Sequence, residues 1–132
     1  ILADPRGPGI KDLVNKIKHR ESFRPFAPAI LAEHASEYFE GMTGDFMQYV
    51  SVCKYPNEFP AVIHYDNTSR VQTVTQQSSP GLRTLLERWY ADTGCPMLLN
   101  TSLNIKGEPL VNTRDDAQRW TKQYGVEVCL PE

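Results

Sequence analysis

Residues 79–100 read SPGLRTLLERWYADTGCPMLLN and carry the clearest structural signal in the chain. Apolar side chains recur there at i, i+3, i+4 and i+7, namely Leu82, Leu85, Leu86 and Trp89. This spacing is typical of the buried face of a helix, with Gly94 as its stop and Pro96 just beyond it. The apolar run at residues 97–99 then predicts a short buried strand. A helix that leads into a buried strand indicates an α/β or α+β domain.

Upstream of this stretch, the sequence predicts one short helix and an extended segment. Asp12 is expected to cap a helix in which Leu13 and Ile17 share a face. This helix must end before Pro25, because the residue before a proline is displaced from the α region. Residues 23–28 are expected to be extended and to lead into a strand at residues 29–31.

Other elements complete a twisted mixed β-sheet with covering helices. A short helix is expected over residues 34–39. Thr113 and Asp116 have the spacing of a capping box, and the helix that follows would bury Ala117, Trp120 and Tyr124. Further strands are expected over residues 46–53, 61–64, 70–75 and 126–130. Short strands interspersed with helices again favour an α/β (α+β) fold.

Length and composition place the chain among ordinary globular domains. It has 132 residues, of which 40% are apolar and 23% charged, with a formal net charge of −2. No apolar run approaches the roughly 18–20 residues that span a bilayer, so we expect no membrane-spanning segment. Three cysteines without a CxxC spacing argue against a zinc site or a disulfide framework and suggest a cytoplasmic location. The three histidines are scattered, so no metal site is expected.

Residues 1–10 are expected to be a loop or a linker from a missing amino-terminal domain. They contain Pro5, Gly7, Pro8 and Gly9, and the chain begins with Ile1 rather than methionine. Residues 11–132 would then be the folded domain. Charge is unevenly distributed between the two ends, since residues 1–24 carry a net +3 and the remaining 108 residues a net −5. A basic start on an acidic body favours a discrete anion site over a broad nucleic-acid surface.

The segment KHRESFRPFAP at residues 18–28 is a candidate anion site. Lys18, Arg20 and Arg24 place three cations within seven residues, next to two prolines that stiffen the backbone. If residues 18–20 are extended, Lys18 and Arg20 project from the same face and meet one anion. Arginine offers a planar fork to phosphate oxygens and lysine a point charge. The alternative is a solvated helix face.

Two further segments carry more polar groups than folding requires. Asn100, Thr101, Ser102 and Asn104 directly follow the predicted strand at residues 97–99, and the carboxyl end of a sheet strand is where open α/β folds bind ligands. The alternative is a turn that caps its own backbone. In the third segment, Arg70 and Gln72 alternate with an apolar residue, so they share a strand face and could reach one ligand. The alternative is a strand face that is exposed to solvent. Phosphate-loop, dinucleotide and hydrolase motifs are absent from the sequence.

Four stretches of this sequence resemble the carboxy-terminal domain of NodU/TobZ-type O-carbamoyltransferases. They are KHRESFRPFAP at residues 18–28, PAVIH at 60–64, SRVQTV at 69–74 and NTSLNIKGEP at 100–109, in matching order and spacing over most of the chain. The sequence departs from the family pattern at Asn67, where glycine is usual, at Leu103, where phenylalanine is usual, and at Arg114, where proline is common. None of these departures removes a proposed ligand contact.

The resemblance implies a YrdC-like fold, in which Lys18-x-Arg20 matches the KxR element and Ser102-x-Asn104 the SxN element. It also implies that the domain binds ATP and carbamoyl phosphate and forms a carbamoyl adenylate with release of pyrophosphate. A larger amino-terminal domain, with a metal site of its own, would then transfer the carbamoyl group to a hydroxyl acceptor. Mg²⁺ is expected with ATP, although the sequence shows no dedicated carboxylate pair for it.

This chemistry gives each candidate residue a role. Lys18, Arg20 and Arg70 are the expected catalytic cations, because preorganised positive charge lowers the barrier where charge develops on the α-phosphate. The expected binding residues are Arg24, Gln72, Asn100, Thr101, Ser102 and Asn104. Among these, Ser102 and Asn104 would orient the nucleotide, and Asn100 would hold the carbamoyl amide.

Two other functions remain open at the level of sequence. The basic start of the chain would suit a nucleic-acid-binding module, whose affinity should fall steeply with salt, although the acidic remainder argues against it. A nucleotide-sensing domain without catalysis is the other alternative, and retention of every proposed contact argues against that.

Overall fold

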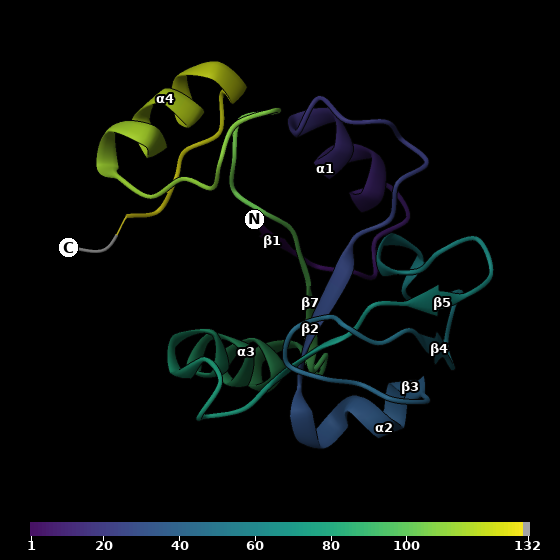
Figure 1. Ribbon diagram of the computed structural model, residues 1–132. Coiled ribbons are helices and arrows are strands. Elements are labelled where there is room, and N and C mark those ends of the chain that lie inside the picture. The colour runs from purple at the N-terminus through teal and green to yellow at the C-terminus, as the bar shows by residue number, and fades with distance from the viewer. Residues whose placement is uncertain (131–132) are drawn as a thin grey trace.

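A computed structural model describes residues 1–130 and shows mixed helices and strands in two sheets (Figure 1). The strands are β1 (Leu2–Ala3), β2 (Ala27–Leu31), β3 (Phe39–Glu40), β4 (Ser51–Cys53), β5 (Thr68–Ser69), β6 (Gln72–Val74) and β7 (Met97–Asn100). The α-helices are α1 (Ile10–Ile17), α2 (Ala35–Tyr38), α3 (Pro80–Thr93) and α4 (Arg114–Tyr124), and two 3₁₀ turns are η1 (Ala32–His34) and η2 (Pro60–Val62). The predicted α+β class is therefore confirmed.

The larger sheet is mixed, as predicted, and has the strand order β1-β7-β2-β6. Strand β7 runs antiparallel to both β1 and β2, whereas β6 runs parallel to β2. The smaller sheet is antiparallel, with the order β3-β4-β5. Because β2 lies between β6 and β7, segments far apart in the sequence meet at the centre of the larger sheet.

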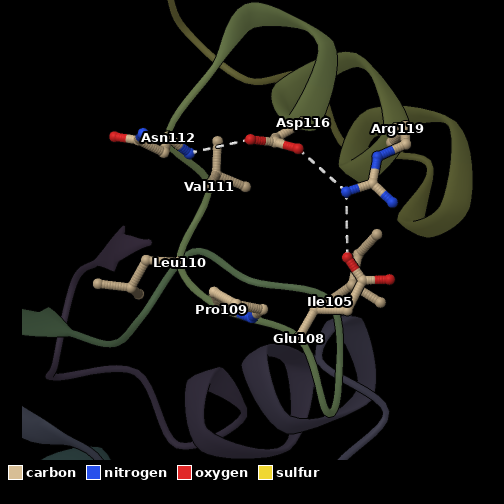
Figure 2. Close-up of a pocket in the computed structure, with 8 residues that line it drawn as sticks. All are labelled: Ile105, Glu108, Pro109, Leu110, Val111, Asn112, Asp116 and Arg119. Carbon is tan, nitrogen blue, oxygen red and sulfur yellow. Dashed lines mark hydrogen bonds and ion pairs between the residues drawn. The ribbon is translucent and has the colours of Figure 1, made fainter.

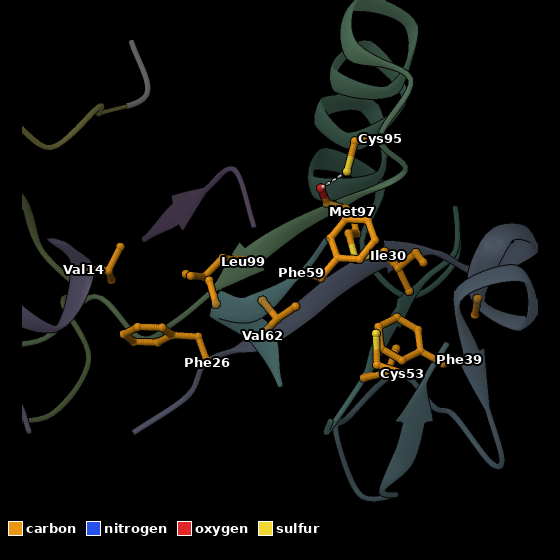
Figure 3. Packing of buried hydrophobic residues seen from close by; sticks show 13 residues of the cluster. Val14, Phe26, Ile30, Phe39, Cys53, Phe59, Val62, Cys95, Met97 and Leu99 are labelled. Carbon is orange, nitrogen blue, oxygen red and sulfur yellow. Dashed lines mark hydrogen bonds between the residues drawn. The ribbon is translucent and has the colours of Figure 1, made fainter. Parts of the chain in front are cut away.

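The two faces of the larger sheet bury different parts of the core. Successive side chains of a strand point to opposite faces. On one face, Leu98 of β7 packs with Ala29 of β2 and Leu86 of α3. The other face presents residues such as Ile30 and Leu99 to a larger cluster, which is drawn in Figure 3. That cluster also contains Val14, Phe26, Phe39, Cys53, Phe59 and Val62, so it joins α1, η2 and the smaller sheet to the larger one.

The two long helices follow the sequence closely. Helix α3 begins with Pro80 at its first turn and ends at Gly94, whose φ of 69° is the left-handed conformation that glycine adopts without strain. Helix α4 begins with the predicted capping box, in which Thr113 accepts from the backbone N–H of Asp116 and the Asp116 carboxylate accepts from that of Thr113. Figure 1 shows α4 set apart from the two sheets.

The prediction for α1 is right about its existence and wrong about its start and its buried face. The helix begins at Ile10 with Gly9 as N-cap, so Asp12 lies within the first turn and caps nothing with its side chain. Leu13 is 53% exposed, whereas Val14 is buried. The inward face of α1 therefore contains Ile10 and Val14, whereas the prediction placed Leu13 on it.

Several predicted strands are shorter, absent or replaced. In residues 46–53 only Ser51–Cys53 is a strand, and residues 126–130 form none. Residues 60–62 form η2 rather than a strand, because Pro60 fixes φ at the start of the turn and donates no ladder hydrogen bond. Leu2 and Ala3, expected in a loop, pair with β7 instead. Within residues 1–130, no helix is long and apolar enough to cross a membrane.

Candidate functional site

The C-terminus of α1 brings Lys18 and Arg20 to the site through a turn, not through an extended segment. The N–H of Arg20 donates to the carbonyl of Asn15 (2.9 Å) and that of His19 to Lys16 (3.1 Å), which is the hydrogen-bond pattern of a Schellman motif. His19 occupies the left-handed position with a φ of 50°. Residues 18–20 therefore do not meet the condition of an extended backbone, and the turn sets the directions of the two cations.

Lys18 is buried and reaches across to the segment that follows β7. Its Nζ donates to the Ser102 carbonyl, to Ser102 Oγ (3.1 Å) and to Asn104 Oδ1 (3.2 Å). Ser102 Oγ in turn donates to Asn104 Oδ1 (2.8 Å). The two predicted motifs, Lys18-x-Arg20 and Ser102-x-Asn104, thus meet directly.

Burial and like charge act together on the cations of this site. Desolvation lowers the pKa of Lys18, and the neighbouring charges of Arg20 and Arg24 lower it further. The pKa of Arg20 is lowered for the same reasons, burial first and Arg24 second. Like charges repel, so an anion placed among these cations would offset the electrostatic cost of holding them together.

Arg20 is fixed by its neighbours more firmly than Arg24 is. The Arg20 guanidinium donates to the Pro25 carbonyl (3.2 Å) and lies 4.8 Å above the ring of Phe26, while its Nε is buried without a hydrogen-bond partner. Within residues 1–130, the Arg24 side chain makes only a long ion pair with Glu21 (3.7 Å), with both side chains about half exposed. An exposed pair of this kind holds its arginine weakly. Arg24 is therefore the more adaptable of the two.

These side chains surround a pocket of about 240 Å³. It is lined by Lys18, Arg20, Arg24, Ser102, Asn104, Lys106 and Gly107. Five of the nine residues predicted for the site are in this set. The other two lining residues, Lys106 and Gly107, were not predicted from the sequence, although both lie in the NTSLNIKGEP stretch. A lysine next to a glycine in a turn, here Gly107 with a φ of 86°, is the signal that was available for them.

Helix α4 anchors the segment that carries Ser102 and Asn104. Trp120 Nε1 donates to the Asn104 carbonyl (3.2 Å), and the Tyr124 hydroxyl accepts from the Lys106 N–H (3.0 Å). The Tyr124 ring also packs against the His19 ring, with 4.9 Å between the ring centroids, and Lys106 Nζ donates to the His19 carbonyl (3.3 Å). The two walls of the pocket are therefore tied together at His19.

The remaining predicted residues lie outside the pocket. Asn100 Nδ2 donates to Gln72 Oε1 (2.8 Å) across β2, on the face of the sheet that α3 covers. Thr101 uses its backbone, whose N–H donates to the Ile1 carbonyl (3.0 Å). Arg70 is exposed just before β6 and does not line the pocket.

A second pocket, of about 280 Å³, lies between the loop at residues 105–112 and α4 (Figure 2). None of the predicted site residues lines it. Its charged groups bind one another, since Arg119 Nη2 contacts both Glu108 Oε2 (3.1 Å) and Asp116 Oδ1 (3.0 Å). Its paired charges hold the loop against α4 and offer little to a ligand.

The cationic pocket does not carry the donor set of a resident metal. Its lining contains no carboxylate, and residues 1–130 contain no group of three or more His, Cys, Asp or Glu side chains that could hold a metal ion. Mg²⁺ prefers carboxylate, phosphate and water oxygens. The side chains that line this pocket therefore offer Mg²⁺ no carboxylate ligand.

Comparison with known proteins identifies the family. The chain matches the family model "Carbamoyltransferase C-terminus" over residues 1–131, so it belongs to this family. It is 42% identical over 124 residues to nodulation protein NolO of Bradyrhizobium diazoefficiens and 37% identical over 123 residues to nodulation protein U of Sinorhizobium fredii. It is also 35% identical over 127 residues to a 3'-hydroxymethylcephem-O-carbamoyltransferase of Amycolatopsis lactamdurans.

These matches cover most of this chain and a small part of each relative. They span 89%, 91% and 96% of the chain, respectively. The same alignments span only 23%, 22% and 24% of the relatives. The chain therefore spans about a quarter of the length of the curated relatives it matches.

Proposed function

We propose that this domain binds ATP and carbamoyl phosphate and forms a carbamoyl adenylate for an O-carbamoyltransferase. The observation that carries the proposal is the convergence of Lys18, Arg20 and Arg24 on one pocket with Ser102 and Asn104. Membership in the carbamoyltransferase family supports this chemistry, and so does the name of the cephem-modifying relative. A YrdC-like arrangement of the mixed sheet is part of the same proposal.

The size of the pocket suits phosphate groups better than a whole nucleotide. Its volume of about 240 Å³ lies below the roughly 300–1,000 Å³ of pockets that enclose drug-sized ligands. The phosphates and the carbamoyl group would occupy the pocket, and the nucleoside would extend outside it. Asn100 precedes Ser102 by two residues and is paired with Gln72, so these two amides are the proposed contacts beyond the pocket.

The proposed reaction puts the cations where charge develops. Water cleaves carbamoyl phosphate to carbamate and inorganic phosphate. A carbamate oxygen then attacks the α-phosphorus of ATP, and the bond from that phosphorus to the β-phosphate oxygen breaks to release pyrophosphate. Lys18 and Arg20 would neutralise the phosphate oxygens, since preorganised donors in a partly buried site act without reorganisation. Arg24 would support them, whereas Arg70 lies outside the pocket.

Transfer of the carbamoyl group to a hydroxyl acceptor is proposed to need a further domain. The relatives are about four times as long as the matched region, which leaves room for a large amino-terminal part. A cytoplasmic location is proposed as well, because ATP is available there and because all three cysteines are free.

The test is ATP–pyrophosphate exchange by this chain, measured with Mg²⁺ and carbamoyl phosphate present. Exchange is expected in the wild type and should be lost in Lys18→Ala and Arg20→Ala. Arg88→Ala is the matched control, because the Arg88 side chain is 80% exposed on α3 and, among the described residues, pairs only with Asp92. Binding of ATP without any exchange, in a full polypeptide that includes this domain, would refute the proposal.

A further inference from the structure

Asn15 is a buried polar residue on α1, and every hydrogen bond it makes beyond α1 goes to the segment that carries the cations. It is 1% exposed. Its Nδ2 donates to the carbonyls of Ser22 (3.3 Å) and Arg24 (2.9 Å), and its backbone carbonyl accepts from the N–H of Arg20. Asn15 therefore holds three backbone groups within five consecutive residues. Its side chain binds two carbonyls, and its backbone carbonyl binds the Arg20 N–H.

Asparagine at this position combines two favourable hydrogen bonds with one unfavourable feature. Its Oδ1 is buried and has no hydrogen-bond partner. A buried acceptor without a partner is unfavourable, whereas an apolar side chain of similar size would avoid that penalty. The two carbonyl acceptors also fix the orientation of the amide, because a flipped amide would bring three oxygens together. The benefit of Asn15 must therefore come from the segment it holds.

That segment has few other restraints. The Arg24–Glu21 ion pair is exposed and long, and His19 stands in a left-handed conformation that is unfavourable for a side chain with a Cβ. Phe23 is 76% exposed, so apolar burial does not hold the middle of the segment either. Without the Asn15 amide, residues 21–24 would keep the hydrogen bond from the Arg24 N–H to the Glu21 carbonyl (3.2 Å) and little else that defines the position of Arg24.

We propose that Asn15 is a positioning residue that presets Arg24, beside Arg20, for the phosphate groups of the ligand. The identity of the ligand in this inference rests on the proposed function. The ordering of the segment rests on the hydrogen bonds alone. Asn15 touches no ligand itself. Its effect on binding acts through the backbone of residues 20–24, since a preorganised site loses less conformational freedom on binding.

Three variants separate this role from general stability. Asn15→Leu keeps the side-chain size and removes both donors. Asn15→Asp keeps the shape and faces two carbonyls with a carboxylate. Val14→Ala is the matched control, because Val14 is the adjacent buried residue of the same helix and makes no side-chain hydrogen bond. Two readouts apply to each: the affinity for pyrophosphate by calorimetry, and the rate of tryptic cleavage after Arg20 under native conditions.

We expect Asn15→Leu to weaken pyrophosphate binding by about tenfold, which corresponds to the loss of the hydrogen bonds that order the segment. Cleavage after Arg20 should accelerate in this variant by more than its change in global stability accounts for. Val14→Ala should change both readouts only in proportion to its loss of stability. For Asn15→Asp, the affinity relative to wild type should recover as the pH falls from 8 to 5, because a protonated carboxyl regains one donor.

Wild-type affinity and wild-type cleavage in Asn15→Leu would overturn the inference. If that variant does not fold, a pH-independent ratio of affinities between Asn15→Asp and wild type would overturn it instead. Absence of pyrophosphate binding in the wild type would refute the proposed function. In that case the cleavage readout still decides the role of Asn15, because it needs no ligand.

Discussion

The ammonium of Lys18 lies 3.2 Å from the amide oxygen of Asn104, although 86 positions separate the two residues in the chain. This contact joins the C-terminus of α1 to the segment after β7 and closes the cationic pocket. It also occupies Lys18 in the ligand-free domain, since the same ammonium contacts Ser102. A phosphate oxygen would therefore enter a network that is already aligned.

The first prediction concerns the charge of Lys18. Lys18→Met keeps the length of the side chain and removes the ammonium, so Ser102 and Asn104 lose a shared donor. We expect the affinity for pyrophosphate to fall by at least about tenfold, because charge-assisted hydrogen bonds are roughly twice as strong as neutral ones. Titration calorimetry measures this effect. Lys11→Met on the same helix is the control, since Lys11 does not line the pocket.

The second prediction is a pH profile that follows from the lowered pKa of Lys18. Above that lowered pKa the side chain is neutral, so pyrophosphate affinity should decline at a pH below the ordinary lysine value of 10.5. In the same window the unfolded chain binds more protons than the folded one at Lys18. The free energy of unfolding of the ligand-free domain should therefore rise with pH there.

Lys18→Arg is the control for this profile, because a guanidinium stays charged throughout the range. The variant is expected to bind with a flatter dependence on pH, whatever its absolute affinity. Identical pH profiles for Lys18→Arg and the wild type would show that another group controls the decline.

The sequence predicted elements well where local patterns agreed with the tertiary structure. Helix α3 combines an apolar face with a glycine stop, and α4 combines an apolar face with a capping box, so local and global preferences coincide. The strand predicted at residues 61–64 was wrong, because an apolar run has no period that distinguishes a strand from a buried turn, and Pro60 favours the turn. Pairing of Leu2 and Ala3 with β7 is non-local and leaves no mark in ten residues rich in proline and glycine.

The site was predictable in composition and not in geometry. Lys18, Arg20, Arg24, Ser102 and Asn104 were all identified from residue type and spacing, and they line one pocket. Their arrangement depends on the turn at His19, where a non-glycine residue adopts a positive φ that no sequence rule indicates. Asn15 was missed for a related reason. A single polar residue in an amphipathic helix reads as solvent-exposed unless its partners are known.

The third prediction concerns the capping box of α4. Thr113→Ala removes the acceptor for the Asp116 N–H and should destabilise α4 by about 1 kcal/mol. Because α4 anchors Asn104 and Lys106, amide hydrogen exchange should accelerate in residues 102–107 as well as in α4. Thr121→Ala, in the last turn of the same helix, is the control and should leave the exchange of residues 102–107 close to wild type.

The fourth prediction is the acid sensitivity of the same helix. Hydrogen bonding to Thr113, followed by Arg119, lowers the pKa of Asp116 from 3.8 to about 2. A carboxyl with a lowered pKa stabilises the folded state above its ordinary value, and this contribution is lost as the pH falls towards 2. Asp116→Asn should therefore speed the exchange of α4 amides at pH 6 and differ little from wild type at pH 2. An equal difference at both values would contradict the assignment.

The fifth prediction tests the backbone turn between the two cations. His19 has a φ of 50°, which is accessible to glycine and strongly unfavourable for a β-branched residue. His19→Val should therefore be less stable than His19→Gly by about 1–2 kcal/mol in chemical denaturation. It should also bind pyrophosphate more weakly, because a change in this turn moves Lys18 relative to Arg20. His19→Gly loses the ring contact with Tyr124 and keeps the turn, so its affinity should stay close to wild type. Equal affinities for the two variants would show that the turn does not set the geometry of the pocket.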